Sequence, residues 1–192
     1  KLFNTAAVLH NGQVITFRDK THLPTYDVFD EDRYFASADS RMPVNLNLRG
    51  RPVKLGIEIC EDLWDEDYLT KVSQELIHVG AEVLVNISAS PFQINRMDER
   101  LDIIKDKSKD LKCYFIYCNL VGAQDELVFD GQSCVVSPAG ELVALSPAFT
   151  EDIQIIDIEN CESVIKPEFN EEEQIFHALS LGARDYFVKT GH

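Results

Sequence analysis

The amino-acid sequence predicts an α/β domain with a mixed β-sheet and helices on its outer faces. In the middle of the chain, apolar runs typical of buried strands alternate with stretches of helical periodicity. Near both ends, apolar runs interrupted by turn residues indicate hairpins, which contribute antiparallel strands. No internal repeat or low-complexity tract points to a different architecture.

The chain begins with a predicted hairpin and a long loop. Residues 2–17 consist of two apolar runs around Asn11 and Gly12, which are suited to the positive φ values of a tight turn. Residues 18–51 are polar and rich in turn-forming residues. Because this segment is too long for a simple connection, we interpret it as a functional loop.

Strands and helices are then predicted to alternate. The predicted buried strands cover residues 52–59, 81–88 and 113–120, and the predicted helices cover residues 65–80 and 95–112. The first helix has an apolar stripe and is predicted to end at Gly80. This stripe consists of Leu69, Val72, Leu76 and Val79.

The last third is predicted to contain a hairpin, a strand and a long helix. Residues 132–145 indicate a hairpin that turns at residues 138–140, and residues 152–159 indicate a further strand. Residues 171–190 are predicted to form a helix with three acidic residues in its first turn, which suit the helix dipole. We expect no C-terminal cap on this helix and interpret the chain as truncated at both ends.

Length and charge exclude several classes of protein. The 192 residues suffice for a domain with a sizeable core. Lysine and arginine number 18 against 33 acidic residues, for a formal net charge of −15. This balance argues against nucleic acid and anionic membranes as partners, because both require basic patches. No apolar run approaches the length of a membrane span.

The five cysteines predict a reducing, cytoplasmic environment. Their number is odd, and they show neither paired zinc-ligand spacing nor a disulfide framework. Four of them are predicted to be small buried hydrophobes, and two of these, Cys113 and Cys118, flank an apparent strand. The other two of these four are Cys134 and Cys161.

Cys60 is the exception, because it lies at the carboxyl end of a predicted buried strand. That edge of a sheet is where α/β proteins place their sites. A thiolate is the reactive form of cysteine, so a catalytic Cys60 needs a cation or a base nearby. Glu61 and Asp62 follow directly and disfavour a thiolate. The required cation must therefore come from elsewhere in the chain.

Lys20, at the start of the long loop, is the candidate cation. Most lysines are solvated surface residues. Pro24 and four aromatic residues nearby favour a packed, lid-like loop instead. His22 also lies here, and we interpret it as a structural histidine because no second histidine or serine partner is evident.

A second polar loop follows the strand predicted at residues 81–88. Ser90 and Arg96 are candidates to hold an anion there, although Arg96 taken by itself fits a helix-surface charge better. An amino-acid substrate offers an ammonium group to a carboxylate and a carboxylate to a guanidinium. We therefore hypothesise that Glu61 and Arg96 bind the two ends of such a substrate while Cys60 faces its side chain.

Taken together, three stretches carry a resemblance to a known family. "KTHLP", "GIEICEDLW" and "NISASPF" occur in this order and at intervals that resemble the nitrilase superfamily. Within it, they are similar to the glutaminase domains of glutamine-dependent NAD synthetases. "FNTAAVLHNGQVI", "YDVFDEDRYF" and "QDELVFDGQSCVVSPAGE" extend the similarity over nearly the whole chain.

The resemblance implies a nitrilase-like α-β-β-α four-layer sandwich and a Glu-Lys-Cys catalytic triad. Cys60 matches the cysteine of the triad, Lys20 matches the lysine, and Glu31 matches an additional glutamate of these enzymes. The family positions that hold glutamine fall on Tyr26, Glu61, Trp64, Ser90 and Arg96.

One departure from the family concerns the general base. The triad glutamate normally lies well upstream of the lysine, yet the nineteen residues before Lys20 contain no glutamate. We therefore expect the isolated chain to be inactive. The expected organisation is a glutaminase domain over 1–160, a linker over 161–170, and a helix over 171–192 that leads to a missing synthetase domain.

The implied reaction is hydrolysis of the glutamine amide through a cysteine thioester. The ammonia would serve the ATP-dependent conversion of deamido-NAD to NAD by the synthetase domain, where ATP and Mg are expected as cofactors. No cofactor is expected in the present domain, and a homo-oligomer is expected. The alternatives are another nitrilase-type carbon-nitrogen hydrolase, or an inactive fragment that keeps only the fold.

Overall fold

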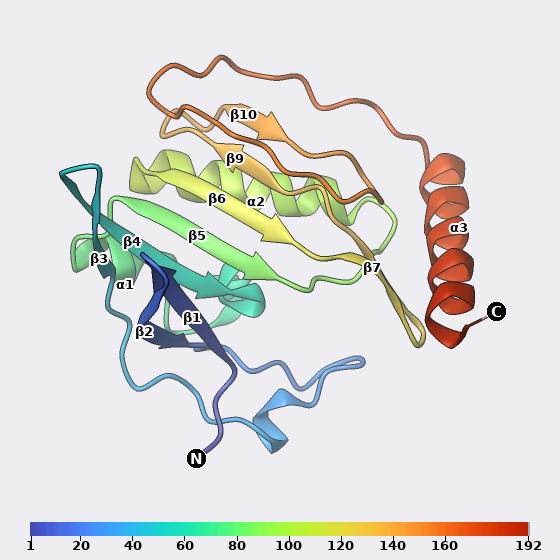
Figure 1. The fold of residues 1–192 in the computed structure, drawn as a ribbon, viewed down its shortest axis with the longest axis horizontal. Helices are drawn as coiled ribbons and strands as arrows, with labels where there is room; N and C mark the ends of the chain where they lie inside the picture. Colours follow the sequence, from blue (N-terminus) through green and yellow to red (C-terminus); the bar gives the residue numbers. More distant parts are fainter. Residues whose placement is uncertain (192) are drawn as a thin grey trace. The chain divides into compact units, whose positions relative to one another are not determined.

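The computed structural model describes residues 1–191. These residues belong to two compact units, Lys1–Ile87 and Ser88–His192, whose elements are labelled in Figure 1. Both units contain helices and antiparallel strand pairs, and the first also contains a parallel pair. The predicted mixed α/β class is thereby confirmed.

The first unit is built from five strands and one short α-helix. The elements are β1 (Thr5–His10), β2 (Gln13–Asp19), β3 (Val44–Leu48), β4 (Arg51–Ile59), α1 (Val72–His78) and β5 (Val83–Ser88, whose last residue is the first of the second unit). Three 3-10 turns cover Glu31–Arg33, Cys60–Leu63 and Asp65–Asp67. Strand β4 pairs antiparallel with β3 and parallel with β5.

The first hairpin forms where the sequence predicts it. Strands β1 and β2 are antiparallel, and Asn11 and Gly12 adopt φ values of 51° and 75° between them. The long loop predicted over residues 18–51 is wrong in its last part, because it contains β3. Asparagine has low strand propensity, but pairing with β4 through the turn at Arg49 and Gly50 overrides that preference.

Helix α1 is shorter than predicted. It begins at Val72, because residues 65–67 form a 3-10 turn and Lys71 is extended. Val72 and Leu76 are buried as expected, whereas Leu69 and Val79 are exposed. The helix approaches the sheet so closely that a Cβ atom on Gly56 would lie 3.2 Å from the Cβ of Leu76.

Within its described residues, 88–191, the second unit contains two long helices and five strands. They are α2 (Arg96–Leu111), β6 (Tyr114–Asn119), β7 (Val121–Gln124), β8 (Leu127–Asp130), β9 (Cys134–Val136), β10 (Leu142–Leu145) and α3 (Glu171–Thr190). Strand β9 pairs antiparallel with both β6 and β10, which confirms the predicted hairpin. Strands β7 and β8 form a further hairpin that the sequence reading missed.

The strand predicted over residues 152–159 is wrong. This segment has no regular secondary structure, and Ile153 and Ile155 are almost fully exposed. Ile156 and Ile158 instead pack against a cluster of buried residues that includes Val143. The apolar pattern therefore reflects local packing of these side chains. A strand would also require a neighbouring strand for its main-chain hydrogen bonds, and no strand of the described residues pairs with this segment.

Helix α3 has the predicted bounds and is capped at both ends. The Asn170 side chain accepts a 2.8 Å hydrogen bond from the Glu173 N–H, and Glu173 accepts one in return from the Asn170 N–H. At the other end Gly191 has a φ of 78° and donates its N–H to Phe187. The prediction of an uncapped end is therefore wrong, because Gly191 supplies the left-handed cap.

The cysteine predictions hold only in part. Cys113 and Cys134 are buried as expected, and burial raises the pKa of Cys134 to about 12. Cys161 is half-buried, and Cys118 is exposed. Cys118 therefore corrects the prediction of a buried thiol. Within residues 1–191, no helix is both long and apolar enough to cross a membrane.

Candidate active site

Lys20 and Glu31 form a pair in the first unit. Lys20 lies directly after β2, and its main chain is held by Asn4 and Ala38 through hydrogen bonds of 2.8 and 2.9 Å. Its side chain is 1% exposed, and its Nζ lies 2.7 and 2.8 Å from the two carboxylate oxygens of Glu31. The loop thus brings together two of the residues that the sequence singles out.

Cys60 lies at a bend immediately after β4. Its φ of 47° is left-handed, a conformation that is costly for a residue with a side chain and is often found at functional sites. The Asn86 side chain donates to the Cys60 carbonyl at 3.4 Å and to the Glu58 carboxylate at 3.4 Å. Ser73 also donates to Glu58, at 2.6 Å. These buried hydrogen bonds stabilise the main chain at the bend.

Asp62 links the cysteine bend to the lysine loop. Its carboxylate accepts hydrogen bonds from the main-chain N–H groups of Thr21 (3.0 Å), His22 (2.8 Å) and Ile59 (3.0 Å). Two of these donors follow Lys20 and the third precedes Cys60. The Asp62 carboxylate therefore binds main-chain N–H groups, which explains why an acidic residue lies so close to the Cys60 thiol in the sequence.

The ionisation of Asp62 predicts a pH dependence of stability. Burial raises its pKa to about 6, although the three N–H donors and Lys20 oppose the increase. Because this pKa exceeds the ordinary value of 3.8, the stabilisation is complete below about pH 4 and is lost as the pH rises through 6. We expect a loss of about 3 kcal/mol in unfolding free energy over this interval, at 1.36 kcal/mol per pH unit.

Urea unfolding of the native protein and Asp62→Asn between pH 4 and 7 tests this expectation. The asparagine variant should lack the Asp62 contribution, so the difference between the two stabilities should change with pH. A pH-independent difference would show that Asp62 titrates at its ordinary value.

Glu61 lies between two tyrosine hydroxyls. Tyr26 donates to its Oε2 at 2.8 Å, and Tyr68 donates to its Oε1 at 3.1 Å. Burial and the Glu61 carboxylate raise the pKa of both phenols, that of Tyr68 to about 12.

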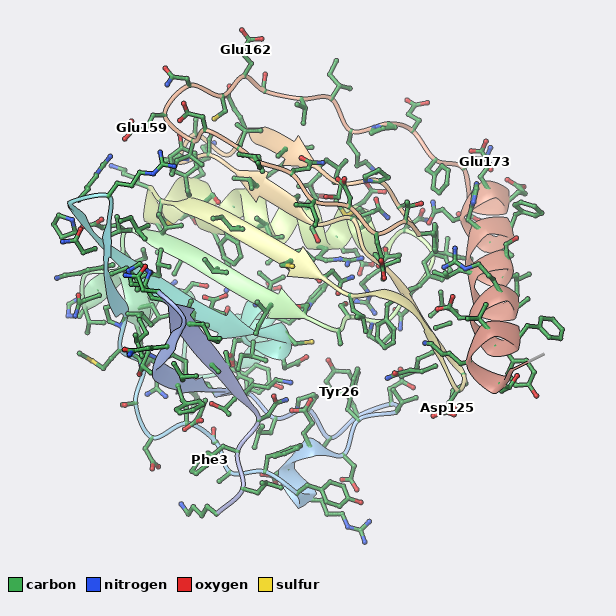
Figure 2. The ribbon with its side chains drawn as sticks, in the orientation of Figure 1. Phe3, Tyr26, Asp125, Glu159, Glu162 and Glu173 are labelled. Carbon is green, nitrogen blue, oxygen red and sulfur yellow. The ribbon has the colours of Figure 1, made fainter. Side chains whose placement is uncertain are left out.

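Tyr68 is not among the site residues that the sequence predicts. It lies in a stretch that the sequence assigned to a helix, and its only local signal was an aromatic residue seven positions after Glu61. Tyr26, labelled in Figure 2, comes instead from the loop after β2. Trp64, a half-buried residue, ends the 3-10 turn of Cys60 and donates its N–H to the Glu61 carbonyl at 2.9 Å.

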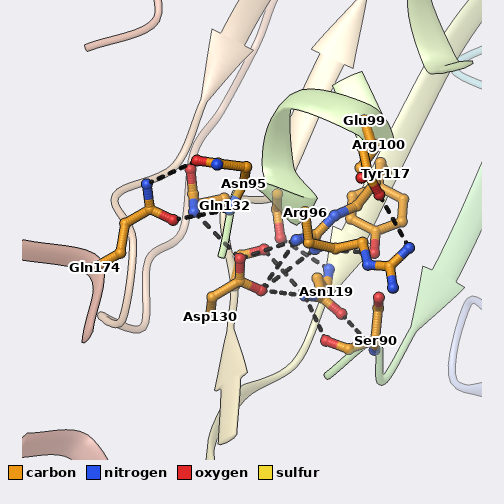
Figure 3. A network of polar contacts seen from close by, with 12 residues as sticks. Ser90, Asn95, Arg96, Glu99, Arg100, Tyr117, Asn119, Asp130, Gln132 and Gln174 are labelled. Atoms are coloured by element: carbon orange, nitrogen blue, oxygen red, sulfur yellow. Dashed lines mark hydrogen bonds and ion pairs between the residues drawn. The ribbon is translucent and has the colours of Figure 1, made fainter. Parts of the chain in front are cut away.

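Ser90 and Arg96 lie in the second unit, and Figure 3 shows their surroundings. Ser90 is buried, and the Asn119 side chain binds both its N–H (2.9 Å) and its carbonyl (3.4 Å). Arg96 is the first residue of α2 and forms a 3.0 Å ion pair with Glu99. Both residues therefore have well-defined local partners.

A buried ion pair stabilises the segment that carries Ser90. Arg100 binds both carboxylate oxygens of Asp130, the shortest contact being 2.9 Å, and donates to Tyr117 at 3.2 Å. Burial lowers the pKa of Arg100, but Tyr117 and Asp130 outweigh burial and hold the pKa above its ordinary value. Asp130 in turn accepts a 3.1 Å hydrogen bond from Asn119.

The described residues contain no group of three or more histidine, cysteine, aspartate or glutamate side chains that could hold a metal ion. The polar side chains near Cys60 instead contact one another and the main chain. The arrangement supplies a thiol, a buried ammonium group and a carboxylate between phenols.

Fold and site together define a nitrilase-like α/β protein with a cysteine at a strand-end bend and a buried lysine–glutamate pair. The family model described as carbon-nitrogen hydrolase matches residues 1–166. The chain therefore belongs to the carbon-nitrogen hydrolase family, as the resemblance in its motifs indicated.

The chain is similar to several proteins that are described as glutamine-dependent NAD(+) synthetases. The glutamine-dependent NAD(+) synthetases of Aquifex aeolicus and Synechocystis are each 36% identical to this chain, over 99% and 100% of its length. The chain spans only 39% and 36% of those two proteins. A solved glutamine-dependent NAD+ synthetase from Acinetobacter baumannii, in complex with ADP, has a TM-score of 0.83 and 30% identity over 98% of this chain and 35% of its own.

Proposed function

We propose that this chain is the glutaminase part of a glutamine-dependent NAD synthetase. In this proposal the Cys60 thiolate attacks the side-chain carbonyl carbon of glutamine, and the carbon–nitrogen bond breaks. The amide nitrogen leaves as ammonia after it gains a proton, and a thioester forms. Water then cleaves the thioester to give glutamate and the free thiol.

Lys20 is assigned to stabilise the negative charge that develops during the attack. Its ammonium group is buried against Glu31, so its position is well defined before substrate binds. A single donor of this kind contributes about 10²–10³-fold to the rate in comparable sites. Glu31 is assigned to keep Lys20 charged and oriented.

The proton acceptor for the thiol is not assigned to a residue of this chain. The resemblance places that glutamate upstream of Lys20, and no glutamate precedes Lys20 in the sequence. Because no residue of this chain is assigned as the proton acceptor, ligand binding and covalent labelling of Cys60 are the measurements that test the proposal.

The assignment of glutamine as the substrate depends mainly on the buried carboxylate of Glu61. Its side chain is 5% exposed, and within residues 1–191 it forms no ion pair. A buried carboxylate normally has a cationic partner. The α-ammonium group of glutamine supplies that partner, whereas a simple neutral amide does not.

The remaining substrate contacts are assigned by resemblance alone: Arg96 to the α-carboxylate of glutamine, and Tyr26, Trp64 and Ser90 to further contacts with glutamine. Deamido-NAD, ATP and Mg²⁺ belong to the synthetase part of the longer protein, and residues 171–192 lead toward it from the glutaminase domain over 1–160 and a linker over 161–170. We further propose a cytoplasmic homo-oligomer that binds neither nucleic acid nor membranes.

A diazo-ketone analogue of glutamine tests the proposal. We expect mass spectrometry to find the label on Cys60, with protection by glutamine and no label in Cys60→Ser. The exposed Cys118 is an internal control for non-specific alkylation. Labelling of Cys113 or Cys118 in place of Cys60 would overturn the proposal. Equal protection by a simple aliphatic amide would favour another carbon-nitrogen hydrolase.

A further inference from the structure

The carboxylate of Glu61 is oriented by two phenols that come from different segments. Tyr26 lies in the loop after β2, and Tyr68 lies directly after the 3-10 turn that ends at Asp67. Each phenol donates to a different oxygen of Glu61, at 2.8 and 3.1 Å. Two donors on two oxygens leave the carboxylate little freedom to rotate, while each oxygen keeps a further lone pair for a ligand.

Tyr68 is itself held in place by His22. The two rings stack with centroids 3.9 Å apart and an angle of 26° between their planes. The His22 main chain donates to Asp62 at 2.8 Å, and its Nε2 lies 3.1 Å from the carbonyl oxygen of Thr70. The chain of contacts therefore runs from the lysine loop through His22 and Tyr68 to Glu61.

The two phenols solvate Glu61 without neutralising it. A phenol is protonated at neutral pH, and the pKa values of both tyrosines are raised further, so each hydroxyl is a donor. A neutral donor leaves the charge of the carboxylate intact, whereas a lysine or arginine would cancel it. A negative charge that is buried, oriented and uncompensated within residues 1–191 is suited to a cationic group of a ligand.

We propose that Tyr68 is a specificity-determining positioning residue, whose hydroxyl orients Glu61 toward the α-ammonium group of an amino-acid amide. Tyr68 thereby selects amides that carry this group over amides that lack it. The inference rests on the proposed function, because it requires that Glu61 binds the substrate. Tyr26 donates a separate hydrogen bond to the other oxygen of Glu61. Because Tyr26 is also a candidate for direct substrate contact, Tyr68 is the residue to test.

The test compares two ligands that differ only in the ammonium group. Calorimetric dissociation constants are measured for L-glutamine and for its analogue without the α-amino group, 5-amino-5-oxopentanoate. For Tyr68→Phe we expect glutamine to bind about tenfold more weakly, the size of one hydrogen bond to a charged group. Binding of the analogue should change by less than about twofold.

Two further variants link the effect to Glu61. Glu61→Gln should abolish the preference for glutamine over the analogue. Adding Tyr68→Phe to Glu61→Gln should then have no further effect, because the hydroxyl acts through the carboxylate. Tyr68→Met removes the hydroxyl in a second way, in case the phenylalanine variant folds poorly. Tyr34→Phe is the matched control, since Tyr34 is exposed in the same unit.

The outcomes separate this inference from the function on which it rests. If the native chain prefers glutamine and Tyr68→Phe keeps that preference, the inference fails while the proposed function stands. Equal weakening of both ligands would likewise make Tyr68 a merely structural residue. If the native chain binds both ligands equally and Cys60 remains unlabelled by the diazo ketone, the proposed function itself fails.

Discussion

Lys20→Met is expected to slow the reaction of Cys60 with the diazo-ketone analogue of glutamine by about 10²–10³-fold. Methionine keeps most of the volume of the lysine side chain but removes the charge to which we assign stabilisation of the thiolate and of the developing oxyanion. It also leaves the Glu31 carboxylate without the ammonium group that lies 2.7 Å away. The rate is measured by mass spectrometry of the Cys60 peptide as a function of time.

Two control variants test whether the slower labelling of Lys20→Met is due to the loss of the Lys20 charge itself. Lys54→Met makes the same chemical change at an exposed position on β4 and should leave the labelling rate unchanged. Lys20→Met/Glu31→Gln removes both charges and shows whether an unpaired Glu31 accounts for the loss. If Lys20→Met reacts as fast as the native chain, Lys20 has no part in activating Cys60.

Arg100→Met is expected to reduce the free energy of unfolding by about 3–5 kcal/mol. Arg100 is fully buried, and the side chain of its partner Asp130 is only 2% exposed. Removing the guanidinium leaves a buried carboxylate without a cation, a more costly state than either a paired or a fully apolar site. Urea-induced unfolding, followed by circular dichroism, measures the loss.

Arg96→Met provides the matched comparison on the same helix. Arg96 pairs with Glu99, whose side chain is 60% exposed, so its loss should reduce stability by less than about 1 kcal/mol. The same variant should lose affinity for glutamine if Arg96 binds the α-carboxylate. Arg100→Met/Asp130→Asn removes both charges and should recover part of the stability. A stability loss that is equal for Arg96→Met and Arg100→Met would contradict the difference in burial.

Much of the fold was predictable because its signals are local. The Asn11-Gly12 turn, the buried strand before Cys60 and the bounds of α3 all follow from residues close together in the sequence. The segment at 152–159 misled the prediction, since an alternating apolar pattern cannot show whether a partner strand exists. Strand β3 was missed for the opposite reason, because β4 supplies the pairing that its asparagines do not favour.

The sequence by itself determined the motifs of the family, and with them Cys60, Lys20 and Glu31 as candidates. Only the tertiary structure decided what Asp62 and Tyr68 do. Asp62 binds backbone groups 40 and 41 residues away, and Tyr68 donates to Glu61 while it stacks on His22. The physical reason is that hydrogen bonds and burial depend on which distant segments meet, and a linear pattern does not contain that information.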